Sequence, residues 1–187
     1  MRIADFRLSL PRAKHDLECT KNYDKVPHDV FTVNSLSCLQ NRRAVWKLAL
    51  YFRREFGYDT APWGYEGKYV DDEAIAYMFT LSDIYSDKED WRQPEYGFGA
   101  VGFRWRRWTD APHGWALQWA WIHPYQRNRG NLSKLWPSLK KLHGDFHVEP
   151  PLSAAMKRFI ESQDAKEAKS DHTNELGGLT ACAGGTP

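Results

Sequence analysis

The residues with the clearest capacity for chemistry lie in one short segment, His123–Leu132, which reads HPYQRNRGNL. Arg127 and Arg129 can donate charge-assisted hydrogen bonds to an anion, and Gly130 has no side chain to keep that anion from the main chain. The first backbone N–H groups of a helix lack partners inside the helix, so a helix that begins here would add donors and a favourable dipole. The segment therefore predicts a loop that binds phosphate or diphosphate.

A strand and a helix on either side of this segment would hold it in place. Residues Trp115–Ile122 alternate between two largely apolar faces, which is typical of a central strand covered on both sides. Apolar spacing predicts a helix over Asn131–Leu142, with a kink or an early break at Pro137. A period of two residues would place four large side chains on one face of the strand: Trp115, Leu117, Trp119 and Trp121.

The preceding half of the chain supplies further elements. Three- and four-residue apolar steps predict an amphipathic helix over Asn41–Phe56, which Gly57 would end. Residues Glu73–Ser82 and Tyr96–Trp108 have the composition and alternation of strands. A turn at Asp110–Gly114 would make the second of them the hairpin partner of the central strand.

The two ends of the chain carry weaker patterns. Residues 1–40 yield few assignments beyond a first strand at Ile3–Leu10. Near the other end we expect a short strand at His147 and Val148 and a helix over Ala154–Ser162, with Ser153 as its N-cap. The polar, glycine-rich remainder predicts one domain over residues 1–163 and a disordered tail over 164–187.

Composition sets the class of protein. The 187 residues are 42% hydrophobic and 27% charged, which suits one globular domain. No apolar run reaches the ~18 residues that a membrane span needs. The three cysteines are odd in number and widely spaced, so we expect a reducing compartment and a cytoplasmic location.

Charge is unevenly distributed along the chain. Residues 100–160 carry 10 Lys and Arg against 3 Asp and Glu, whereas residues 61–99 carry 3 against 9. This division predicts an anionic ligand near the first segment and a cationic or amine partner near the second. Two solvated faces that partly neutralise each other would give the same pattern.

The order of hairpin, central strand, R-x-x-G loop and helix resembles the GNAT superfamily of N-acetyltransferases. Arg127–Leu132 is similar to the family's Arg/Gln-x-x-Gly-x-Gly/Ala loop, and Ile122-His123-Pro124 is similar to its apolar-x-Pro strand end. The resemblance covers about Glu73–Ile160 and implies a mixed α/β (α+β) fold, with a mostly antiparallel central sheet flanked by helices. Little sequence follows Ser162, so the family's last strands would be missing or supplied by another chain.

The resemblance also implies a reaction and its ligands. The co-substrate would be acetyl-CoA, and the acceptor would be an amine on a protein lysine, an N-terminus or a small molecule; no metal ion and no membrane are implied. The acceptor would lie near the aromatic loop Trp63–Tyr69 and the acidic residues 71–73, and pantetheine would pair with the edge of the central strand. The implied cofactor-binding residues are Ile122, Arg127, Asn128, Arg129, Gly130, Asn131 and Leu132.

The chain differs from the family's pattern at positions that matter for catalysis. Leu132 stands where the family has Gly or Ala, and Phe159 stands near the place where many members have a tyrosine that protonates the leaving thiolate. The central strand contains no Asp or Glu that could act as a base. The remaining candidates for proton transfer are His123, Tyr125 and either Glu73 or Asp72, each of which could also be an ordinary surface or packing residue.

A second function is a non-catalytic binding module on the same scaffold, acting on nucleic acid or a protein partner. The FRWRRW run, Phe103–Trp108, mixes cations with indoles, as single-stranded nucleic acid sites do. A strand with Phe103 and Trp105 inside and arginines outside explains the run equally. The spacing of His15, Cys19, His28 and Cys38 matches no standard zinc site.

Overall fold

The computed structural model describes residues 10–14, 26–27, 29–64, 73–82 and 95–179, with side chains through residue 166. The chain forms two compact units, residues 1–149 and 150–187, and each is described by itself. The expected strand Ile3–Leu10 lies outside the described residues except for Leu10. Within these ranges no helix combines the length and the apolarity that crossing a membrane requires. The elements are β1 (Arg12–Ala13), β2 (Val30–Val33), α2 (Leu39–Phe56), β3 (Ala74–Ser82), β4 (Glu95–Arg106), β5 (Gly114–Ile122), the 3₁₀ turn η3 (Pro124–Gln126), α3 (Asn131–His143), β6 (His147–Val148) and α4 (Ala154–Leu179).

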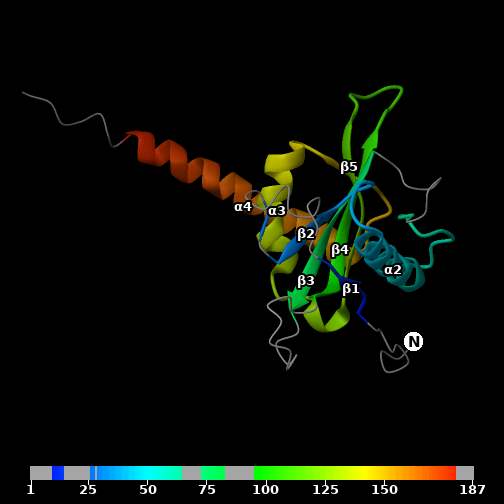
Figure 1. Ribbon diagram of the computed structural model, residues 1–187. Coiled ribbons are helices and arrows are strands. Elements are labelled where there is room, and N and C mark those ends of the chain that lie inside the picture. Colours follow the sequence, from blue (N-terminus) through cyan, green and yellow to red (C-terminus); the bar gives the residue numbers. More distant parts are fainter. Residues whose placement is uncertain (1–9, 15–25, 28, 65–72, 83–94, 180–187) are drawn as a thin grey trace, which may run out of the picture. The chain divides into compact units, whose positions relative to one another are not determined.

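A six-stranded sheet forms the centre of the first unit (Figure 1). Its strand order is β2-β3-β4-β5-β6, and β1 pairs with the beginning of β4. All neighbours are antiparallel except β5 and β6, which are parallel and joined through α3. The predicted fold class, a mostly antiparallel mixed sheet flanked by helices, is confirmed.

Helix α2 covers one face of the sheet. Its apolar stripe, which includes Ala44, Val45 and Leu48, is fully buried against side chains of β2, β3, β4 and β5. The helix begins two residues before the predicted start, at Leu39, and ends where predicted. Gly57 ends it in the left-handed conformation, with φ 72°, and its N–H donates to Arg53 O over 2.9 Å.

Helix α3 covers the opposite face of the sheet, as Figure 1 shows. His143 stacks on Phe103 of β4, with ring centroids 4.4 Å apart, and Leu135 and Leu139 are fully buried. The helix is not broken at Pro137, contrary to the early break considered from sequence. Pro137 lies on the exposed side, and the buried residues before and after it hold both turns on the sheet.

A β-bulge in β5 corrects the predicted face of the central strand. Gly102 pairs with Trp119 and Phe103 pairs with Leu117, so Gln118 has no partner in β4. The extra residue reverses the alternation, so Trp119 and Trp121 pack in the α2 cluster whereas Trp115 contacts His143 of α3. The four large side chains expected on one face are therefore divided between the two faces.

The second unit contains α4. Ser153 caps its start, since Ser153 Oγ accepts a hydrogen bond from Met156 N over 3.2 Å, as predicted. The helix continues beyond the predicted end at Ser162 to Leu179, so residues 164–179, expected to be disordered, are helical. Alanine, lysine and glutamate in the AKEAK run at 165–169 have high helix propensity, which explains the extension. Residues 180–187 lie outside the described part of the chain.

Candidate cofactor-binding site

One edge of β5 is only partly paired. Along its other edge β5 pairs with β4 from Gly114 to Ile122, but it pairs with β6 only at Ala116 and Leu117. His123 N donates to Phe98 O over 2.8 Å, and the alternation of an antiparallel ladder then turns the backbone groups of Ala120 and Ile122 away from β4. No strand of the described chain pairs with that edge beyond Leu117. The backbone groups of Ala120 and the N–H of Ile122 can therefore hydrogen-bond an extended ligand, whereas Ile122 O accepts from Arg127.

The loop that follows β5 leads into α3 through two left-handed residues. Asn128 has φ 59° and Gly130, the N-cap of α3, has φ 77°. A Cβ built on Gly130 would meet no heavy atom within 4 Å, so the space beside this backbone is open. Asn131 Nδ2 donates back to Gln126 O over 2.9 Å and does not cap the helix. Among the described residues, no side chain accepts a hydrogen bond from the first N–H groups of α3.

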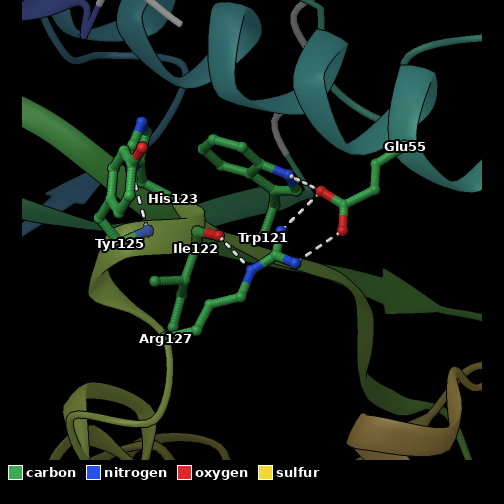
Figure 2. Close-up of polar contacts among 6 residues, drawn as sticks. All are labelled: Glu55, Trp121, Ile122, His123, Tyr125 and Arg127. Atoms are coloured by element: carbon green, nitrogen blue, oxygen red, sulfur yellow. Dashed lines mark hydrogen bonds and ion pairs between the residues drawn. The ribbon is translucent and has the colours of Figure 1, made fainter. Parts of the chain in front are cut away.

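Arg127 is held by partners within the protein (Figure 2). Its Nε donates to Ile122 O over 2.8 Å, and its two Nη atoms donate to the Glu55 carboxylate over 2.7 and 2.6 Å. Trp121 Nε1 donates to the same carboxylate over 2.8 Å. All three nitrogens of the Arg127 guanidinium thus have acceptors, whereas Arg129 is exposed at the loop surface.

Glu55 could not be identified as a site residue from the sequence, because its partners are 66 and 72 residues away along the chain. Burial alone would raise the pKa of the Glu55 carboxyl. The hydrogen bonds from Arg127 and Trp121 and the Arg127 charge outweigh it, so the pKa lies below its usual value of 4.5. The only signal in the sequence is an acid in the last turn of a helix, where the dipole disfavours negative charge.

His123 and Tyr125 lie side by side at the end of β5, with ring centroids 5.5 Å apart. His123 Nδ1 accepts the Tyr125 N–H over 3.3 Å, so the neutral ring that makes this bond carries its proton on Nε2. Burial and the charge of Arg127 lower the pKa of His123 below 6.5, which favours this neutral form. The Tyr125 side chain is 73% exposed at the surface.

The structure does not bring Glu73 to this pair. Glu73 O accepts the Trp105 N–H over 2.8 Å, whereas His123 pairs with Phe98. These β4 partners are separated by about 20 Å along the strand, at its usual rise of roughly 3.3 Å per residue. The Glu73 carboxylate forms an ion pair with Arg107 at that far end.

At the other ligand sites predicted from sequence, the side chains either pack or pair within the protein or lie outside the described residues. In the FRWRRW run, Phe103 is buried and Trp105 packs on Trp115 with centroids 5.6 Å apart. Arg106 makes two hydrogen bonds to Glu149, and Arg107 pairs with Glu73, so these cations have carboxylate partners. Trp63 is buried in the α2 cluster, and the rest of the expected acceptor region, residues 65–72, is not described.

Two features of the described residues concern ligands other than acetyl-CoA. The described residues contain no group of three or more His, Cys, Asp or Glu that could hold a metal ion, and of the four considered for zinc only Cys38 is described. A groove of about 630 Å³ lies between β1 and the first half of α2. Its cations include Arg43 and Lys47, which have partners within the protein.

Comparison with known proteins finds similarity in structure and not in sequence. No protein-family model and no curated protein matches the chain. Among solved structures, one similar protein is a ribosomal-protein-alanine N-acetyltransferase from Brucella melitensis biovar Abortus 2308, with 12% identity, a TM-score of 0.42, and coverage of 72% of this chain and 88% of that one. Another is an aminoglycoside acetyltransferase from an uncultured soil metagenomic sample, with 6% identity, a TM-score of 0.45, and coverage of 76% and 89%.

Proposed function

We propose that the protein is an acyl-CoA-dependent N-acyltransferase that moves an acetyl group from acetyl-CoA to an amine. The observation that carries the proposal is the continuity of two groups of main-chain donors and acceptors. The partly paired edge of β5 leads into a loop that ends at Gly130, the N-cap of α3. The space beside Gly130 is open, and the amides of α3 that follow it have no side-chain cap. An extended arm that ends in a diphosphate suits both parts of this surface.

The residues present fit such a ligand. The diphosphate would accept hydrogen bonds from the amides of residues 131–133, with charge from the exposed Arg129, while the arm would lie along Ala120 and Ile122. Leu132, which stands where the resemblance expects Gly or Ala, has no atom within 4 Å of a Cβ built on Gly130 and so leaves the space beside Gly130 open.

The chemistry left to the chain's own residues is modest. The neutral amine attacks the thioester carbonyl carbon, the C–N bond forms, the C–S bond breaks, and the amine loses a proton while the thiolate gains one. Tyr125 is the exposed phenol that would give the thiolate its proton, and the Nε2–H of His123 would donate a hydrogen bond to developing negative charge. Strand β5 contains no carboxylate that could act as a general base. The acceptor amine would therefore arrive from solution already deprotonated.

The proposal is tested by intact-mass analysis of an amine panel incubated with acetyl-CoA. We expect transfer by the wild type and loss of transfer in Gly130→Trp, whose side chain would fill the space over the α3 amides. Gly57→Trp is the matched control, because Gly57 is also left-handed with open space beside it but lies at the end of α2. Equal transfer by the wild type and Gly130→Trp would refute this cofactor site. Absence of transfer, together with absence of thermal stabilisation by millimolar coenzyme A, would favour the binding module.

A further inference from the structure

Glu55 connects α2 with the loop after β5. The carboxylate lies in the last turn of α2, beside Arg53 and Arg54, where the helix dipole favours cations and disfavours an acid. It nevertheless accepts three hydrogen bonds, one from Trp121 and two from Arg127. Because an acid at this position does not stabilise α2, the presence of Glu55 is better explained by its contacts with Trp121 and Arg127.

The contact acts on the loop through Arg127. While two guanidinium nitrogens bind Glu55, the third binds Ile122 O, so Arg127 is fixed both to α2 and to the last residue of β5. On the other side of the loop, Asn131 binds Gln126 O. These two ties lie on either side of Asn128 and Gly130, the two residues with positive φ that turn the chain into α3.

We propose that Glu55 is a positioning residue, which through Arg127 holds the loop in the conformation that presents the α3 amides to a diphosphate. The inference rests on the proposed function and deepens it. It changes the role of Arg127 from a ligand of the diphosphate to a support of the loop, and it makes Arg129 the arginine of this loop that contacts the ligand.

The ion pair of Glu55 and Arg127 is exposed enough to distinguish a role in positioning the loop from a role in the global stability of the protein. The side chains of Arg127 and Glu55 are 37% and 33% exposed, and ion pairs that are this accessible to water contribute little to global stability. Loss of the pair should therefore change the loop and its ligand more than the unfolding midpoint.

The test compares coenzyme A with pantetheine, which lacks the diphosphate and the phosphorylated adenosine attached to it. Calorimetry measures the affinity of the wild type, Glu55→Gln, Arg127→Gln and the double variant for coenzyme A and for pantetheine. We expect each single variant to bind coenzyme A about tenfold more weakly and pantetheine equally well, and the double variant to be no weaker than either single one. Arg107→Gln, which breaks the ion pair with Glu73, is the matched control and should bind coenzyme A as the wild type does.

Hydrogen exchange supplies a readout that needs no ligand. The hydrogen-bonded amides that flank the loop, those of Gln126 and Lys134, should exchange faster in Glu55→Gln and Arg127→Gln than in the wild type and in Arg107→Gln. Unchanged exchange together with unchanged affinity for coenzyme A would overturn the positioning role. If the wild type binds no coenzyme A, the proposed function fails, and the exchange rates alone then decide whether Glu55 orders the loop.

Discussion

The indole of Trp119 in β5 lies directly over Gly102 in β4, so that a Cβ on Gly102 would come within 2.0 Å of Trp119 Nε1. Both residues are paired in the centre of the sheet, and Trp119 is 3% exposed within the α2 cluster. The absence of a side chain at position 102 is therefore what allows a tryptophan to fill this part of the core.

Gly102→Ala should destabilise the protein by about 2 kcal/mol, since an added methyl group in a closely packed core forces its neighbours to shift. The expected fall in Tm is roughly 4–8 °C for a chain of this size. Gly114→Ala in β5 is the control, because its Cβ would meet only Trp108 at 3.9 Å, an ordinary contact. Thermal unfolding followed by circular dichroism checks the difference, and equal midpoints for the two variants would contradict it.

The buried pair of His143 and Tyr77 should make stability depend on pH. Tyr77 Oη and His143 Nε2 are 2.8 Å apart, and burial lowers the pKa of His143 from 6.5 to about 4 while it raises the pKa of Tyr77. The unfolded chain therefore binds a proton at His143 more readily than the folded chain. Stability is fully present above pH 6.5 and is lost as the pH falls from 6.5 towards 4.

The loss from this one group should be about 2 kcal/mol by pH 4, after a discount for the partial access of water to the ring. His143→Gln keeps a polar partner for Tyr77 but does not titrate, so its free energy of unfolding should fall less over the same interval. Denaturant unfolding at several pH values measures both curves. Parallel curves for the two proteins would show that His143 does not control this dependence.

The elements that follow from local patterns could be predicted, and those that depend on distant contacts could not. The stripe of Ala44, Val45 and Leu48 predicts α2 because helical periodicity is contained in neighbouring residues. The partnership of Glu55 and Arg127 joins residues 72 apart, so no pattern in either segment contains it. The residue type and spacing of Arg127 suit a ligand of an anion. The direction of its side chain, however, depends on Glu55 of α2, which binds the guanidinium.

Tyr125 offers a direct test of the proposed proton transfer. Tyr125→Phe should lower kcat by about 10²-fold, in the range for general acid catalysis, with little change in KM for acetyl-CoA. Stability should hardly change, because the side chain is 73% exposed. Tyr58→Phe is the control, since Tyr58 is also exposed and lies after α2. Steady-state kinetics decide the matter, and an unchanged kcat would remove Tyr125 from the mechanism.

The bulge at Gln118 determines which face of the sheet each tryptophan of β5 enters. If Gln118 were instead paired in a regular ladder, the alternation of β5 would carry Trp119 and Trp121 from the α2 side to the α3 side, where Phe103 and His143 already fill the space. Both tryptophans are 3% exposed or less, and losing the packing of even one large aromatic side chain costs about 3–5 kcal/mol.

Deletion of Ala120, which pairs with Val101 beyond the bulge, turns Trp121 to the opposite face and should therefore remove much of the stability of the domain, which is typically about 5–15 kcal/mol. Deletion of Gln118 is the matched control, because Leu117 and Trp119 would then pair with consecutive residues of β4 and keep their faces. Near-ultraviolet circular dichroism reports the packing of the tryptophans, and thermal melts report the cooperativity of unfolding. We expect both signals to collapse only in the Ala120 deletion; if the two deletions behave alike, the bulge at Gln118 does not set the faces of β5.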